Sequence, residues 1–73
     1  MRLRTDRERA VWAAVYAMHV EGRMFDAPAE CSIPGNEDRW ARYEVGVAVQ
    51  ACNRADAAVE RLREALAECK RTD

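Results

Sequence analysis

The stretch ADAAVERLREALAEC, residues 55–69, decides the fold, because its apolar side chains recur at alternating steps of four and three residues. The same alternation continues back along the chain as far as Ala41. This 3.5-residue repeat is typical of a helix that packs lengthwise against another helix. The apolar seam so defined consists of Ala41, Val45, Ala48, Cys52, Ala55, Val59, Leu62, Leu66 and Cys69.

The seam lies within a long predicted helix of about residues 36–71. Asn36 is a favourable N-cap residue. Glu37 and Asp38 place negative charge in the first turn, where the helix dipole favours it. No proline follows, and Gly46 is the only glycine in this part of the chain. The sequence therefore predicts one uninterrupted rod.

A shorter helix is predicted over about residues 5–22. In its capping box Thr5 accepts a hydrogen bond from the N–H three residues on, and Glu8 reaches back to the N-cap N–H. The apolar residues that follow occupy every side of this helix, which should end near Gly22, a residue suited to a left-handed terminus. The loop, about residues 23–35, holds both prolines and has room for one helical turn.

The composition bounds the chain to one small all-α domain, residues 1–73, built as a helical hairpin. Twelve basic and thirteen acidic residues give a net charge of -1, which argues against a dedicated nucleic-acid-binding protein. No apolar run approaches the roughly 18 residues of a membrane span. Three widely spaced cysteines without a CxxC motif indicate reduced thiols in a cytoplasmic protein. Only Cys31, in the loop, is expected to face solvent.

The short helix is expected to fold back antiparallel on the first half of the long one. This register places Met18 beside Trp40 and Val11 beside Val47. Beyond about Ala55 the long helix would then have no partner within the chain. Its apolar side chains there would remain in water, although burying each is worth roughly 1.5–3 kcal/mol.

A second copy of the chain resolves this excess of apolar surface. We expect an antiparallel homodimer, a four-helix bundle in which the two long helices cross near Ala55. The expected interface with this copy or another partner consists of Ala48, Cys52, Ala55, Ala58, Val59, Leu62, Ala65, Leu66 and Cys69. The alternative is a monomeric hairpin whose exposed end binds a different protein.

Residues with catalytic or metal-binding signatures are not found in the sequence. His19 is the only histidine, and no glutamate stands three residues before it, as a di-iron bundle requires. Phosphate-binding loops and nucleophile elbows are absent as well. We therefore expect no enzymatic activity, no cofactor and no metal. The expected anchor for a protein partner is Trp40, with Arg39 and Tyr43 beside it.

The stretches RAVWAAVYA, residues 9–17, and ADAAVERLREAL, residues 55–66, resemble small helical accessory proteins encoded by bacteriophages and prophages. The resemblance implies a role exercised by binding a host protein and carries over no functional residue. The expected function is a non-enzymatic interaction module, acting as an adaptor, regulator or inhibitor. Two alternatives are a structural subunit of a larger complex and a nucleic-acid-binding bundle that uses the arginines Arg2, Arg4, Arg7 and Arg9.

Overall fold

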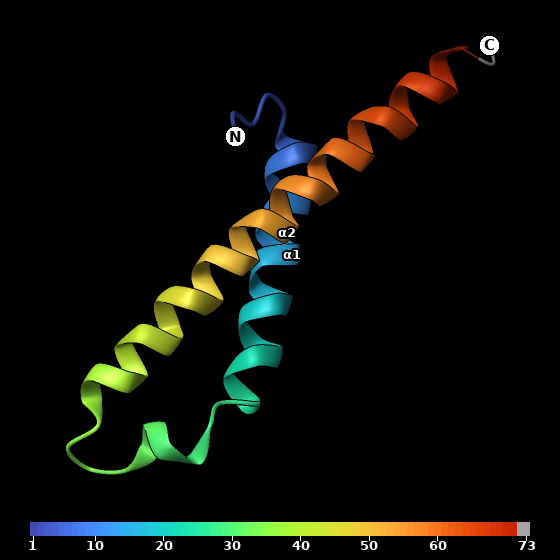
Figure 1. Ribbon diagram of the computed structural model, residues 1–73. Helices are drawn as coiled ribbons and strands as arrows, with labels where there is room; N and C mark the ends of the chain where they lie inside the picture. The colour runs from blue at the N-terminus through green and yellow to red at the C-terminus, as the bar shows by residue number, and fades with distance from the viewer. Residues whose placement is uncertain (72–73) are drawn as a thin grey trace.

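The computed structural model describes residues 1–71, which form two antiparallel helices joined by a loop (Figure 1). Helix α1 spans Asp6–Phe25, a 3-10 helix (η1) spans Ala29–Ser32, and helix α2 spans Glu37–Arg71. The described residues contain no strand. The predicted all-α hairpin is confirmed, and the loop does contain one helical turn.

The start of α1 shows the first half of the predicted capping box. Thr5 Oγ1 accepts a hydrogen bond of 3.1 Å from the N–H of Glu8, and Thr5 itself has extended backbone angles. The second half of the prediction is wrong. Glu8 Oε1 accepts instead from the N–H of Arg4, at 2.9 Å, because the carboxylate also turns toward α2, where Arg63 binds it.

The end of α1 lies beyond its predicted position. The helix passes through Gly22 and continues to Phe25, since glycine permits a left-handed terminus without imposing one. The hydroxyl of Tyr43 donates to the carbonyl of Arg23, which satisfies one of the acceptors that a helix end leaves open. The glycine with positive φ is Gly35, at 94°, immediately before the turn into α2.

Asn36 joins the loop to α2. Its carbonyl oxygen accepts from the N–H groups of Arg39 and Trp40, at 3.0 and 3.2 Å, and so begins the helix. Its side-chain amide donates to the carbonyl of Glu30 in η1, at 2.9 Å. Asn36 therefore stands before α2 as predicted, while its amide nitrogen holds the loop against the helix.

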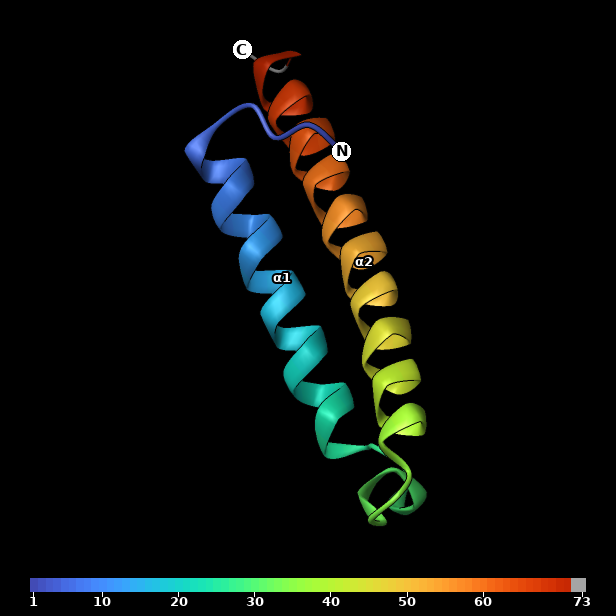
Figure 2. The same ribbon diagram turned by 90° about the vertical axis from the view of Figure 1, so that its left-hand side faces the viewer.

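The molecule is a thin rod, one layer of two helices, as Figure 2 shows. Its extents are 59 × 20 × 14 Å and its radius of gyration is 16.5 Å, against roughly 11 Å for a compact domain of this length. The accessible surface is 5818 Å², whereas a compact monomer of this mass exposes roughly 4,600 Å². The hairpin therefore leaves much more surface in water than a closed domain does.

The core is a single row of small side chains on α2. Val47 is 3% exposed, and the other three members are completely buried: Ala51, Ala55 and Val59. These residues recur every four positions, which is the spacing of the ridges that interdigitate when two helices cross at an angle. Figure 1 shows α1 and α2 crossing in this way. Contact within the chain thus follows this row, here named the contact row, which shares just Ala55 and Val59 with the 3.5-residue seam.

The predicted register of the two helices is wrong. Trp12 lies beside Asp56 and Glu8 beside Arg63, so α1 is displaced by several turns toward the C-terminal half of α2. The loop explains the shift, because it carries the chain past the end of α1 before α2 begins (Figure 1). As a result Val59, expected to lack a partner within the chain, is completely covered.

Candidate interaction surface

The predicted interface residues fall into three sets by exposure. Ala55 and Val59 are completely buried under α1, so a partner cannot reach them while the hairpin is closed. Contact between two long helices through the Ala55 side chain would therefore require α1 to move away. The expected homodimer stays a prediction. The half-buried set is Ala48, Cys52, Ala58 and Leu62. The exposed set is Ala65, Leu66 and Cys69.

The predicted anchor residues make contacts within the chain. Arg39 forms an ion pair of 3.0 Å with Glu30 of η1. Trp40 is half-buried, with its ring centre 6.2 Å from that of Tyr43. The Tyr43 hydroxyl in turn donates to the Arg23 carbonyl. Together these side chains fasten the loop end of the hairpin.

The side of α2 that points away from α1 is apolar over its first half. Val45 is 64% exposed and Val49 is 56% exposed. Each stands two residues from the contact row, which is about 200° around a helix. This back row, spaced every four residues, consists of Ala41, Val45, Val49, Asn53 and Ala57, all exposed. Within the described chain nothing packs on Val45 or Val49 closely enough to bury them.

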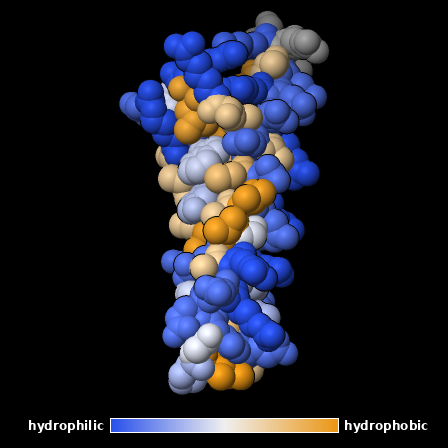
Figure 3. Space-filling model, turned by 60° about the vertical axis from the view of Figure 1, so that its left-hand side comes forward, coloured by the Kyte–Doolittle hydropathy of each residue, from blue (hydrophilic) through white to orange (hydrophobic). Residues whose placement is uncertain are grey.

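Helix α1 adds further uncovered apolar surface. Met18 is 71% exposed, and four alanines on the same helix are exposed: Ala10, Ala13, Ala14 and Ala17. Figure 3 shows hydrophobic side chains along one face of the rod, between hydrophilic borders. Exposed single apolar residues are ordinary, but a series along both helices of one layer is a candidate association surface.

Glu8 and Arg63 form the ion pair that ties the N-terminal end of α1 to α2. Glu8 is 6% exposed, and its two carboxylate oxygens accept from Arg63 Nη2 at 2.8 Å and Nε at 3.1 Å. Arg63 Nη2 also donates to the carbonyl of Arg2, at 2.8 Å, which holds the N-terminal segment over the pair. Such two-point contacts between a guanidinium and a carboxylate are strong and directional.

This environment shifts the pKa values of both Glu8 and Arg63. The pKa of Glu8 falls from 4.5 to about 2, chiefly because Arg63 donates to the carboxylate and next because the Arg4 N–H does; burial acts in the opposite direction. The pKa of Arg63 is raised by the same hydrogen bond. This pair was not predicted from the sequence. The position of Arg63 four residues after Val59, on the contact row, is the signal that finds it.

Trp12 makes the second polar contact between the helices. Its indole Nε1 donates to Asp56 Oδ1 at 2.8 Å, and its ring stacks on Tyr16 with centres 5.2 Å apart. Asp56 belongs to a row of α2 that lies one residue after the contact row. This acidic row, again spaced every four residues, consists of Glu44, Ala48, Cys52, Asp56, Glu60, Glu64 and Glu68.

Two adjoining hollows lie on the other side of the contact between α1 and α2. One, of about 290 Å³, is lined by Val15, Met18, His19 and Arg54. The other, of about 330 Å³, is lined by Val15, Arg54, Ala57, Ala58 and Arg61. The His19 Nε2 atom is buried and has no hydrogen-bond partner among the described residues. His19 as a whole is half-buried.

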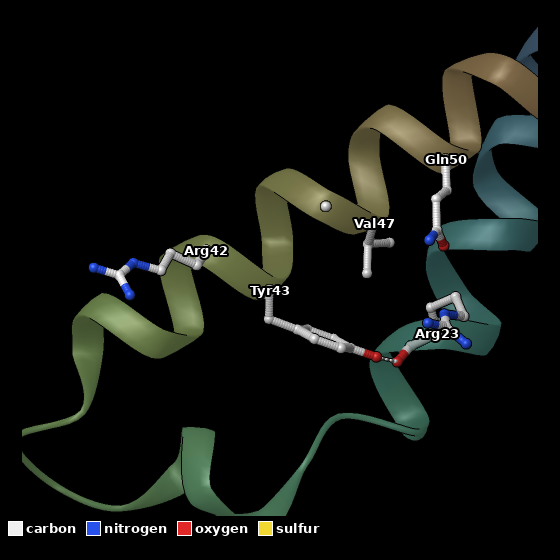
Figure 4. A pocket seen from close by; sticks show the side chains of 6 residues that line it. Arg23, Arg42, Tyr43, Val47 and Gln50 are labelled. Carbon is white, nitrogen blue, oxygen red and sulfur yellow. Dashed lines mark hydrogen bonds between the residues drawn. The ribbon is translucent and has the colours of Figure 1, made fainter.

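A third hollow, of about 250 Å³, lies nearer the loop and is shown in Figure 4. Tyr43, Val47 and Gln50 project from α2 toward α1, and Tyr43 meets the Arg23 carbonyl. Arg42 extends away from these side chains. This hollow is lined by two arginines, Arg23 and Arg42, and one of its lining side chains, Tyr43, is already held by a contact within the chain.

The remaining chemistry of the described residues is sparse. No three His, Cys, Asp or Glu side chains gather there in a way that suits a metal ion. Neither described helix has an apolar segment long enough to cross a membrane. Cys69 is exposed and Cys31 is half-buried, which reverses the predicted accessibility of the thiols, because η1 draws the loop toward α2.

Comparisons with protein-family models, curated proteins and solved structures found no match to this chain.

Proposed function

We propose that this chain is a non-enzymatic protein-interaction module that completes its core by pairing with a second copy. The observation that carries the proposal is the apolar back of α2, where Val45 and Val49 face away from α1 and remain exposed. In this proposal the chain acts as an adaptor, regulator or inhibitor. That is the class of role implied by its resemblance to phage accessory proteins.

The surface areas support pairing. The rod exposes 5818 Å², about 1,200 Å² more than a compact monomer of this mass. A standard stable interface removes about 800 Å² from each partner. Pairing two such layers face to face therefore removes an area comparable to the excess, and it produces the two-layer architecture of a four-helix bundle.

The size of the core supports the same conclusion. Within the part of the chain that the structure describes, the buried apolar residues are Val47, Ala51, Ala55 and Val59, and two of these four are alanines. Domains of this length bury little surface and commonly depend on a metal, a disulfide or a partner chain. A second copy is the partner that the exposed valines favour.

Light scattering of the purified chain tests the proposal. The expected mass is twice 8.3 kDa at micromolar concentration, and the double variant Val45→Asp/Val49→Asp is expected to fall to 8.3 kDa. The matched control Asn53→Asp/Ala57→Asp, at the polar end of the same row, is expected to retain the doubled mass. A wild-type mass of 8.3 kDa at all concentrations would refute self-association. A double variant that keeps the doubled mass would place the interface elsewhere.

A further inference from the structure

The two hollows beside Arg54 adjoin, because Val15 and Arg54 line both of them. The floor is apolar and shallow because the α2 side chains there are small, Ala57 and Ala58, and Met18 borders it from α1. Arg61 stands at the far end. This Arg54–Arg61 groove combines a strip of small apolar side chains with two guanidinium groups.

The two arginines of the groove are unpaired within the described chain, where neither forms an ion pair or a side-chain hydrogen bond. Arg9, Arg39 and Arg63, in contrast, each bind a carboxylate. The cause lies in the arrangement of α2. Arg54 has no carboxylate three or four residues away on the helix, because those positions hold Gln50, Ala51, Ala57 and Ala58. Glu64 stands three residues after Arg61 but forms no ion pair with it.

We propose that the Arg54–Arg61 groove binds an acidic amphipathic helix of a partner protein. Arg54 and Arg61 are seven residues apart, about 10 Å along a helix. A partner helix lying along α2 has the same rise, so carboxylates seven residues apart on its edge meet both guanidinium groups. Its small or aliphatic side chains then cover Ala57, Ala58 and Met18 in the helix-in-groove mode.

The partner is a protein helix and not a nucleic acid for two reasons. An apolar floor between the arginines suits methyl groups and not a phosphate backbone. The acidic row on the same helix and the net charge of -1 oppose a polyanion, whereas a nucleic-acid site shows a basic face. The inference rests on the proposed role as a binding module, but it does not require self-association, because Val45 and Val49, which carry that proposal, do not line the groove. Ala57 belongs to both surfaces.

Fluorescence anisotropy with a designed peptide tests the groove. The probe is a labelled helical peptide of about 21 residues, with leucine and alanine along one face and glutamates seven residues apart at its edge. Saturable binding to the wild-type chain is expected. The charge reversal Arg54→Glu/Arg61→Glu should weaken it about tenfold or more. The matched reversal Arg9→Glu/Arg42→Glu, outside the groove, should change the affinity less than about twofold.

A charge-swap experiment decides whether the arginines recognise the charge of the peptide. The same peptide with lysine in place of glutamate should bind Arg54→Glu/Arg61→Glu and not the wild-type chain. Equal binding of the glutamate peptide to wild type and to this variant overturns the proposal. So does tighter binding of a single- or double-stranded oligonucleotide at equal ionic strength.

Light scattering separates this proposal from the proposed function. Arg54→Glu/Arg61→Glu should keep the doubled mass. Conversion of this variant to 8.3 kDa would show that the groove holds a second copy, which upholds self-association and overturns the partner helix. A wild-type monomer that binds the peptide with the expected charge dependence would leave the groove proposal standing and reject only the dimer.

Discussion

The contact row and the back row of α2 have similar composition and opposite surroundings. Val47 and Val59 on the contact row are 3% and 0% exposed, while Val45 and Val49 on the back row are 64% and 56% exposed. Residue type does not separate these rows; the position of α1 does. The comparison teaches that α2 is a helix with two packing surfaces, of which the chain itself covers one.

The largest expected effect comes from placing a charge on the contact row. Val59→Asp introduces a carboxylate into a completely buried position without a partner and should cost about 3 kcal/mol or more. That cost is most of the stability of so small a domain. Urea unfolding followed by circular dichroism checks it. Val49→Asp, at an exposed position, should keep the helical signal in water; comparable loss in both variants would erase the distinction between the rows.

Acid should next weaken the end of the contact row. The pKa of Glu8 lies at about 2 in the folded chain against 4.5 ordinarily, so the ion pair with Arg63 stabilises the fold fully above pH 4.5. This contribution is lost as the pH falls from about 5 to 2. Thermal melts across that range should show a decreasing Tm. In Glu8→Gln the decrease should be smaller and the Tm at pH 7 lower; an identical pH profile in both proteins contradicts the assignment.

A smaller effect is expected from a matched pair of side-chain truncations, which compares the two rows directly. Val47→Ala removes two methyl groups from a buried site and should cost about 2 kcal/mol in the free energy of unfolding. Val45→Ala, two residues away, should cost under about 0.5 kcal/mol within one hairpin and should instead raise the dissociation constant of the dimer. Denaturation at low concentration and sedimentation at several concentrations separate these effects. An unchanged dissociation constant would remove Val45 from the interface.

The smallest expected effect is a gain. Gly46 lies inside α2 and has open space where a Cβ would stand, so Gly46→Ala meets no obstruction. The substitution should stabilise the hairpin by about 1 kcal/mol, because alanine restricts the unfolded chain and favours the helix. A rise in the urea midpoint with an unchanged slope is the measurement. A fall would mean that another molecule packs against the glycine.

Much of the local structure was readable in advance. The Thr5 cap, the start of α2 after Asn36 and the length of α2 follow from short-range signals: a side-chain acceptor, early acidic residues and the absence of proline. The end of α1 was misplaced because Gly22 permits termination without requiring it, and a tertiary hydrogen bond from Tyr43 supports the longer helix.

The interaction surface was harder to read. The alternation of fours and threes is present in the sequence, yet the chain buries every fourth residue, because the two helices cross instead of winding around each other. The 3.5-residue spacing of the seam and the four-residue spacing of the buried row differ little over one turn, but the difference accumulates along the rod. As a result Val45 and Leu66 lie outside the contact between α1 and α2, whereas Val59 is covered.

Helix content, helix limits within a few residues and an excess of apolar surface are therefore properties of the sequence, since they depend on neighbours within one or two turns. The displacement of α1 along α2, the Glu8–Arg63 and Trp12–Asp56 contacts and the Arg54–Arg61 groove depend on the path of the loop and the crossing of the helices. The path of the loop and the crossing of the helices are set by contacts between residues far apart in the sequence. No local signal specifies which of several ridges on α2 receives α1, and that choice decides which residues remain free for a partner.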